Sequence, residues 1–103
     1  MEEIFGKTVE KPDIERKNLK LPSRSKFEKL PTAREKFEVR DENDRTWNCH
    51  CSKSSDKSYL NVEGWDHFVE TQGIKAGRSW IGLHKEDDSF SPGATPYKFK
   101  VRN

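Results

Sequence analysis

The clearest structural signal in the chain is the segment GWDHFVETQGIKAG, residues 64–77. Within it, Trp65, Phe68 and Val69 stand at positions i, i+3 and i+4, a spacing that predicts a helix with one apolar face. Gly73 stands where a left-handed C-cap would end this helix, and apolar Ile74 follows it. Helical spacing favours a core face over a ligand platform for these residues, so we expect the helix to cover a small core.

On either side of this helix the apolar residues mostly alternate with polar ones, which is typical of strands with one buried face. Strands are expected at residues 4–9, 19–21, 37–39, 47–51, 58–61, 80–83 and 97–101. Ser25 and Glu28 fit a capping box, which predicts a second short helix over residues 23–30. The connections are too short for parallel crossovers, so the sequence predicts antiparallel neighbours in a mainly β chain that closes into a barrel.

Composition is consistent with one small folded domain spanning residues 1–103. Apolar residues make up 30% and charged residues 37%, which leans toward disorder, but three Trp, two Tyr and six Phe supply enough buried area for a core. No stretch approaches the length of a membrane-spanning helix, so we expect a soluble intracellular protein without a membrane partner. Two cysteines cannot form a disulfide framework.

The segment Cys49–Cys51, with His between the two thiols, is the strongest candidate for a metal site. On a strand, however, the thiols point to one side and the imidazole to the other, and His67 and His84 are isolated in the sequence. We therefore expect packed core cysteines, with no metal or other cofactor. The acidic run 86–88 is expected to be a solvated turn. No phosphate loop, nucleophile elbow or catalytic set is present, so we expect neither enzymatic activity nor a small-molecule substrate.

Positive charge is concentrated in part of the chain. Residues 7–29 carry a local net charge of +4, whereas the whole chain carries +2. Such a segment suits a polyanion such as nucleic acid, although a charged run is also typical of a solvated face. The stripe of Lys98, Lys100 and Arg102 is expected to be such a solvated face. The segments 11–20 and 53–58 remain as functional candidates, because both are expected in loops or at strand ends.

Several short motifs occur in a characteristic order along nearly the whole chain, from about residue 4 to 101. They are Phe5, Lys7, Val9, Asp13 and Ile14, then Leu19–Pro22, Trp47, Tyr59 and Leu60, Gly64–Val69, Gly73 and Ile74, and Ala76 and Gly77. In this order the motifs resemble the plant B3 DNA-binding domain family. The family usually carries Asp after Ala-Gly, where this chain has Arg78, and an aromatic residue at the tip of the second arm, which this chain lacks.

The resemblance implies a seven-stranded open β-barrel, or pseudobarrel, with two short α-helices. It also implies a sequence-selective DNA-binding domain of a plant transcription regulator in the nucleus, whose two arms grip the major groove of double-stranded DNA. The first arm would be Lys11, Pro12, Asp13, Arg16, Lys17, Asn18 and Lys20, and the second Lys53, Ser54, Ser55, Asp56, Lys57 and Ser58. Lys and Arg would neutralise phosphates, while Arg16, Asn18, Ser54 and Ser55 would reach base edges.

Two other functions are compatible with the same barrel. One is the DNA-specificity module of a bacterial restriction enzyme, which would require a nuclease region outside these residues. The other is a protein-interaction barrel that has lost DNA binding, which the low net charge and the missing aromatic residue of the second arm favour. A titration with random-sequence duplex distinguishes the last function from DNA binding.

Overall fold

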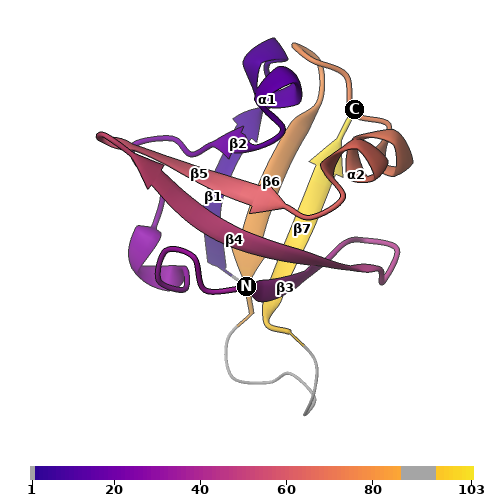
Figure 1. Cartoon of the computed structure of the whole chain (residues 1–103). Coiled ribbons are helices and arrows are strands. Elements are labelled where there is room, and N and C mark those ends of the chain that lie inside the picture. The colour runs from indigo at the N-terminus through magenta and orange to yellow at the C-terminus, as the bar shows by residue number, and fades with distance from the viewer. Residues whose placement is uncertain (1, 87–94) are drawn as a thin grey trace.

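Seven strands form one strongly curled sheet in the computed structural model, which describes residues 2–86 and 95–103 (Figure 1). The strands are β1 (Glu2–Thr8), β2 (Leu19–Lys20), β3 (Phe37–Arg40), β4 (Thr46–Ser54), β5 (Lys57–Val62), β6 (Trp80–Lys85) and β7 (Tyr97–Arg102). The helices are α1 (Lys11–Arg16), α2 (Trp65–Gln72) and the short 3-10 helix η1 (Phe27–Lys29). Neither α-helix is long and apolar enough to cross a membrane within these described residues.

The strand order in the sheet is β1-β6-β7-β3-β4-β5-β2, so β1 and β2 form two unpaired edges. The expected seven-stranded open barrel with two α-helices is therefore confirmed. The prediction of antiparallel neighbours is wrong at one place, because β3 and β7 pair in parallel, with Val39 opposite Tyr97. A parallel pair needs a long connection, which excludes parallel pairing only for strands joined by a short loop. The connection from β3 to β7 is long, because β4, β5, α2 and β6 lie between them in the sequence.

An aromatic cluster fills the core where α2 packs on the sheet. Phe68 is fully buried, meets Trp47 edge-on at 5.0 Å between ring centroids, and lies 5.1 Å from Phe99 of β7. Cys49 and Cys51 share the buried face of β4, as expected. Burial raises the pKa of the Cys51 thiol to about 11 and that of Cys49 further still, so both thiols stay protonated at neutral pH.

The helix expected over residues 23–30 is wrong, and only η1 forms there. The Ser25 hydroxyl donates to the carbonyl oxygen of Pro22 at 2.7 Å instead of capping a helix. The Lys26 N–H donates to the carbonyl oxygen of Ile4 on β1, at 2.9 Å. A long-range backbone bond therefore replaces the local helical one, which a capping pattern in the sequence does not reveal.

The second α-helix lies instead in the first arm, over residues 11–16, where no helix was expected. Pro12 is compatible with the first turn of a helix, because its missing N–H would have no helical partner there. The Asp13 carboxylate accepts the backbone N–H of Glu10 at 2.9 Å and so caps the helix.

The acidic turn expected at residues 86–88 falls mostly within residues 87–94, outside the described residues.

Arg78, which stands where the family usually has an acid, is exposed in the turn between α2 and β6. Its N–H donates to the carbonyl oxygen of Lys75 at 3.1 Å. The hydroxyl of Ser79, which is 1% exposed, accepts the Lys75 N–H at 2.8 Å. The neighbouring serine thus holds this turn without a carboxylate.

A buried carboxylate closes the turn between β3 and β4. Asp41 accepts the Trp47 indole N–H and the Gln72 amide, each at 2.9 Å, together with two backbone N–H groups of its own turn. Burial acts to raise the pKa of Asp41, but the hydrogen bonds from Trp47, the backbone and Gln72 outweigh it and hold the pKa below its ordinary value. The carboxylate therefore ties the β3–β4 turn to both β4 and α2.

Replacing Asp41 with Ala is expected to lower the free energy of unfolding by about 2 kcal/mol at neutral pH, because the buried indole N–H loses its acceptor. Urea unfolding followed by tryptophan fluorescence measures this. Asn43→Ala in the same exposed turn is the control, with an expected change within about 0.5 kcal/mol. Equal losses in the two variants would contradict the role given to Asp41.

The same variant has a predicted pH dependence. The pKa of Asp41 is lower in the folded chain than in the unfolded chain, so its stabilisation is complete above the unfolded value and is lost as pH falls through the folded value. The stability difference between wild type and Asp41→Ala is therefore expected to shrink as the pH is lowered from 7 to about 3. A difference that stays constant over this range would contradict the assignment.

Candidate nucleic-acid interface

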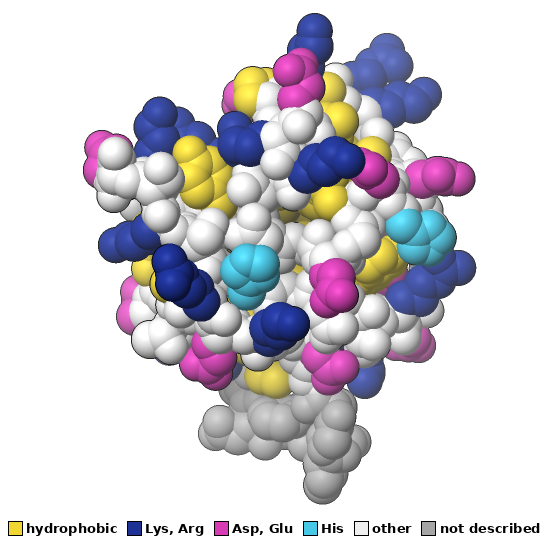
Figure 2. Space-filling model, viewed as in Figure 1, with side chains coloured by type: hydrophobic (Ala, Val, Ile, Leu, Met, Phe, Trp, Pro, Cys, Tyr) yellow, Lys and Arg dark blue, Asp and Glu magenta, His cyan; other side chains and the backbone are white. Residues whose placement is uncertain are grey.

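The two arms line a single cleft of about 920 Å³, which lies between α1, β2 and the tip of the β4–β5 hairpin. From the first arm it is lined by Pro12, Asp13, Arg16 and Lys20, and from the second by Lys53, Asp56, Lys57 and Ser58. Figure 2 shows Lys and Arg side chains at the top and upper left of the molecule, over α1 and toward the hairpin tip, and also elsewhere on this face, mixed with Asp and Glu side chains. Segments far apart in the sequence therefore meet at one concave surface.

Five of the expected site residues do not line this cleft. They are Lys11, Lys17, Asn18, Ser54 and Ser55. Sequence reasoning had not included seven residues that do line it, namely Lys7, Glu10, Leu21, Pro22, Ser23, Phe27 and Tyr59. Tyr59 lies opposite Lys20 because β2 pairs with β5, and the strand patterns in the sequence do not predict that pairing. The position of Lys7 depends on a buried partner that no local pattern indicates.

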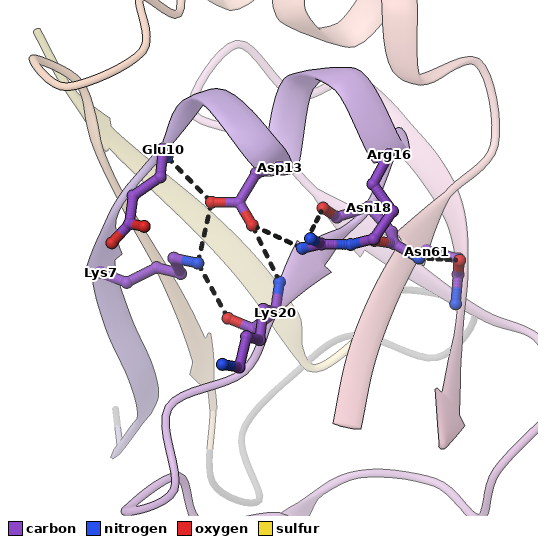
Figure 3. Close-up of polar contacts among 7 residues, drawn as sticks. All are labelled: Lys7, Glu10, Asp13, Arg16, Asn18, Lys20 and Asn61. Carbon is purple, nitrogen blue, oxygen red and sulfur yellow. Dashed lines mark hydrogen bonds and ion pairs between the residues drawn. The ribbon is translucent and has the colours of Figure 1, made fainter. Parts of the chain in front are cut away.

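Asp13 is the centre of the first arm, although it was expected to face DNA (Figure 3). Its side chain is 2% exposed. One carboxylate oxygen lies 2.8 Å from the Lys7 ammonium and accepts the Glu10 N–H at 2.9 Å. The other accepts Nη2 of Arg16 at 2.9 Å and the backbone N–H of Lys20 at 3.1 Å. Four donors from β1, α1 and β2 therefore converge on one carboxylate.

Electrostatics keep this carboxylate charged. Burial acts to raise the pKa of Asp13, but the hydrogen bond from Lys7 and the backbone N–H groups of Glu10 and Lys20 outweigh it and lower the pKa below its ordinary value. Lys7 also donates to the carbonyl oxygen of Lys20 at 2.9 Å, which ties β1 to β2 across the open side of the barrel. The buried ion therefore fixes the geometry of the first arm.

Arg16 joins the first arm to the second. Its guanidinium donates from Nε to the Asn18 side-chain oxygen and lies 4.8 Å from the ring centroid of Tyr59 on β5. The Asn18 amide donates to the Asn61 side-chain oxygen at 3.1 Å, and Asn61 donates to the Ser52 hydroxyl at 2.9 Å. This polar chain runs from α1 through β5 to β4, so hydrogen bonds link the first arm to the two strands that carry the second arm.

The second arm is a two-stranded ribbon that ends in a tight turn. Ser54 pairs with Lys57, and Ser55 and Asp56 form the turn between them. Ser55 has φ of 58°, a left-handed conformation typical of short hairpin turns. Lys53 and Lys57 are exposed, and neither forms an ion pair within the described part of the chain. They are therefore available to an external anion.

The remaining cations of the first arm have other neighbours. Lys17 ends α1 with φ of 67°, and its ammonium lies 2.8 Å from the carboxylate of Asp66 on α2. Lys11 is exposed and lies 3.9 Å from Glu15. Both therefore stand at the periphery of the cleft rather than in it.

The cleft wall as a whole carries a modest positive charge. Five cations, Lys7, Arg16, Lys20, Lys53 and Lys57, face three carboxylates, Glu10, Asp13 and Asp56. Two of those cations already neutralise Asp13. Within residues 2–86 and 95–103, no group of three His, Cys, Asp or Glu side chains is placed to hold a metal ion. Because cations outnumber carboxylates in its wall, the cleft can bind an anionic surface through ammonium and guanidinium groups.

Positive side chains of β7 have a different environment. Lys98 lies 2.6 Å from Glu86, and Arg102 lies 2.9 Å from Glu42. These pairs lie outside the cleft and are partly solvated, as expected for this stripe. Lys98 and Lys100 therefore provide matched controls for charge removal away from the cleft.

Two comparisons with known proteins give matches to this chain. The family model of the B3 DNA binding domain matches residues 5–93. Among solved structures, the Arabidopsis FUS3–DNA complex has a TM-score of 0.70 and 18% sequence identity to this chain, covering 98% of this chain and 97% of that one, which shows a shared fold. A comparison with curated protein sequences finds no match. Since the family model spans most of the sequence, the chain belongs to the B3 DNA binding domain family.

Proposed function

We propose that this domain binds double-stranded DNA sequence-selectively in the major groove, as part of a plant transcription regulator that acts in the nucleus. The observation that carries the proposal is the convergence of two cationic segments, distant in sequence, on one cleft. Membership of the B3 family and the fold shared with a protein solved in complex with DNA support it. The proposal involves no catalytic step, cofactor or small-molecule substrate.

The shapes of the two arms suit a groove. B-DNA has a major groove about 12 Å wide, which admits either an α-helix or a two-stranded β-ribbon. The first arm presents the short helix α1, and the second presents the β4–β5 ribbon. The polar chain through Asn61 holds the helix and the ribbon in a fixed relation. A rigid pair of arms can therefore read one face of a duplex without first being ordered.

The cations divide into two groups by their partners. Lys20, Lys53 and Lys57 have no ion pair within the described residues and are assigned to phosphates, which gives affinity without sequence information. Arg16 donates from Nε and Nη2 to Asn18 and also from Nη2 to Asp13, so only its Nη1 group has no acceptor among the described residues. A guanidinium held in this way can donate from Nη1 to an acceptor on a guanine edge.

The other arm residues take roles that follow from their contacts. Asn18 both accepts from Arg16 and donates to Asn61, so we assign it a positioning role. Asp13, buried among its donors, is likewise assigned to positioning the arm. Ser54 and Ser55 stand at the exposed tip of the ribbon, where their hydroxyls can reach base edges.

Selection from a randomised duplex library tests the proposal most fully, because it reports both binding and sequence preference. Enrichment of one motif is the expected result. If duplexes are retained but no motif is enriched, the result supports DNA binding and contradicts sequence selectivity. No retention at about 50 mM salt would favour a protein-interaction barrel instead.

Salt dependence provides a quantitative prediction. With three to five phosphate contacts, affinity is expected to fall roughly 40- to 500-fold between about 50 and 200 mM salt. Lys53→Ala combined with Lys57→Ala should weaken all duplexes alike and reduce the slope of log affinity against log salt by about 2. Fluorescence anisotropy measures both. The matched control is Lys98→Ala combined with Lys100→Ala, and an equal change in that control would place the DNA on another face.

Asp13→Asn tests whether the buried carboxylate positions the arm or merely repels phosphates. A positioning role predicts a loss of about tenfold in DNA affinity, the scale of one hydrogen bond to a charged group. If the Asp13 carboxylate only repels phosphates, Asp13→Asn should instead raise the DNA affinity. Glu15→Gln removes an exposed charge from the same helix without breaking these contacts, so it should raise affinity slightly. A gain in affinity for both variants would contradict the positioning role.

A further inference from the structure

Among the described residues, Phe27 is the one large hydrophobic side chain that is exposed, with 39% of its surface accessible. A single exposed apolar residue is ordinary on a protein surface. Its location is informative, however, because Phe27 lines the same cleft as Arg16, Lys53 and Lys57. A phenyl ring therefore faces the space that the proposed function assigns to DNA.

The backbone that carries Phe27 is held in place on both sides. Before it, the Lys26 N–H donates to the carbonyl oxygen of Ile4 on β1 at 2.9 Å. After it, the carbonyl oxygen of Lys29 accepts the Tyr97 hydroxyl at 2.7 Å. These bonds fix η1 against β1 and β7. The ring is thus presented from an anchored turn.

We propose that Phe27 packs against the C5 methyl group of a thymine in the major groove, so that it contributes to base selectivity. This inference rests on the proposed function. A phenyl ring offers no hydrogen bond to a phosphate or to a polar base edge. Among the base edges in the major groove, the thymine methyl group is the apolar feature, and Phe is one of the side chains that contacts it.

A deoxyuridine scan tests the inference, because deoxyuridine lacks only that methyl group. In the selected duplex, each thymine is replaced in turn, and binding of wild type and Phe27→Ala is measured by fluorescence anisotropy. The affinity of wild type is expected to fall about fourfold when one particular thymine is replaced. This factor corresponds to about 0.8 kcal/mol for one buried methyl-sized group. The affinity of Phe27→Ala should hardly change when the same thymine is replaced by deoxyuridine.

Two further variants sharpen the comparison. Phe27→Leu keeps an apolar side chain and should retain part of the methyl effect. Glu28→Ala changes an exposed neighbour that does not line the cleft, so it should retain the full effect. Thermal melting confirms that each variant is folded at the assay temperature.

Each outcome of the scan has a distinct meaning. The same pattern of losses in wild type and Phe27→Ala would overturn the inference. Uniform weakening of every duplex by Phe27→Ala, with the methyl effect intact, would also overturn it, because it indicates a sugar contact. If wild type binds no duplex at all, the proposed function itself fails, and that result is separate from either pattern.

Discussion

A carboxylate that is almost fully removed from water must be matched by donors, and Asp13 has four. They come from Lys7 on β1, from Glu10 and Arg16 at the two ends of α1, and from Lys20 on β2. Breaking such a site leaves both an unpaired ion and unpaired donors, which is strongly destabilising. The relative positions of β1, α1 and β2 therefore depend on this one buried charge, and with them the shape of the first arm.

The second arm depends on strand register. The short strand β2 places Leu19 opposite Leu60 and Lys20 opposite Tyr59, so β5 supports both arms at once. Leu19 and Leu60 are fully buried, which fixes the register, because a slip by one residue would expose them. The separation of the arms is therefore set by the sheet. Two segments of modest charge become one binding surface through this shared strand.

Sequence patterns identified the elements whose signals are local. The spacing of Trp65 and Phe68 predicts α2, and alternation predicts the strands, because burial on one face imposes these periods. Long-range bonds account for the errors. The helix expected over residues 23–30 does not form because Lys26 bonds to β1, and α1 depends on Asp13, whose burial requires partners from three elements. A charged residue read from sequence alone is expected at the surface, so its positioning role was not predictable.

The central claim is that one duplex occupies the cleft between the two arms. Backbone amide chemical-shift mapping, with the selected duplex titrated into labelled protein, tests it most directly. The account predicts the largest shifts for residues 11–20 and 53–59, with small shifts for α2 and for residues 98–102 of β7. Shifts concentrated on β7 or α2, with those of the arms unchanged, would contradict it.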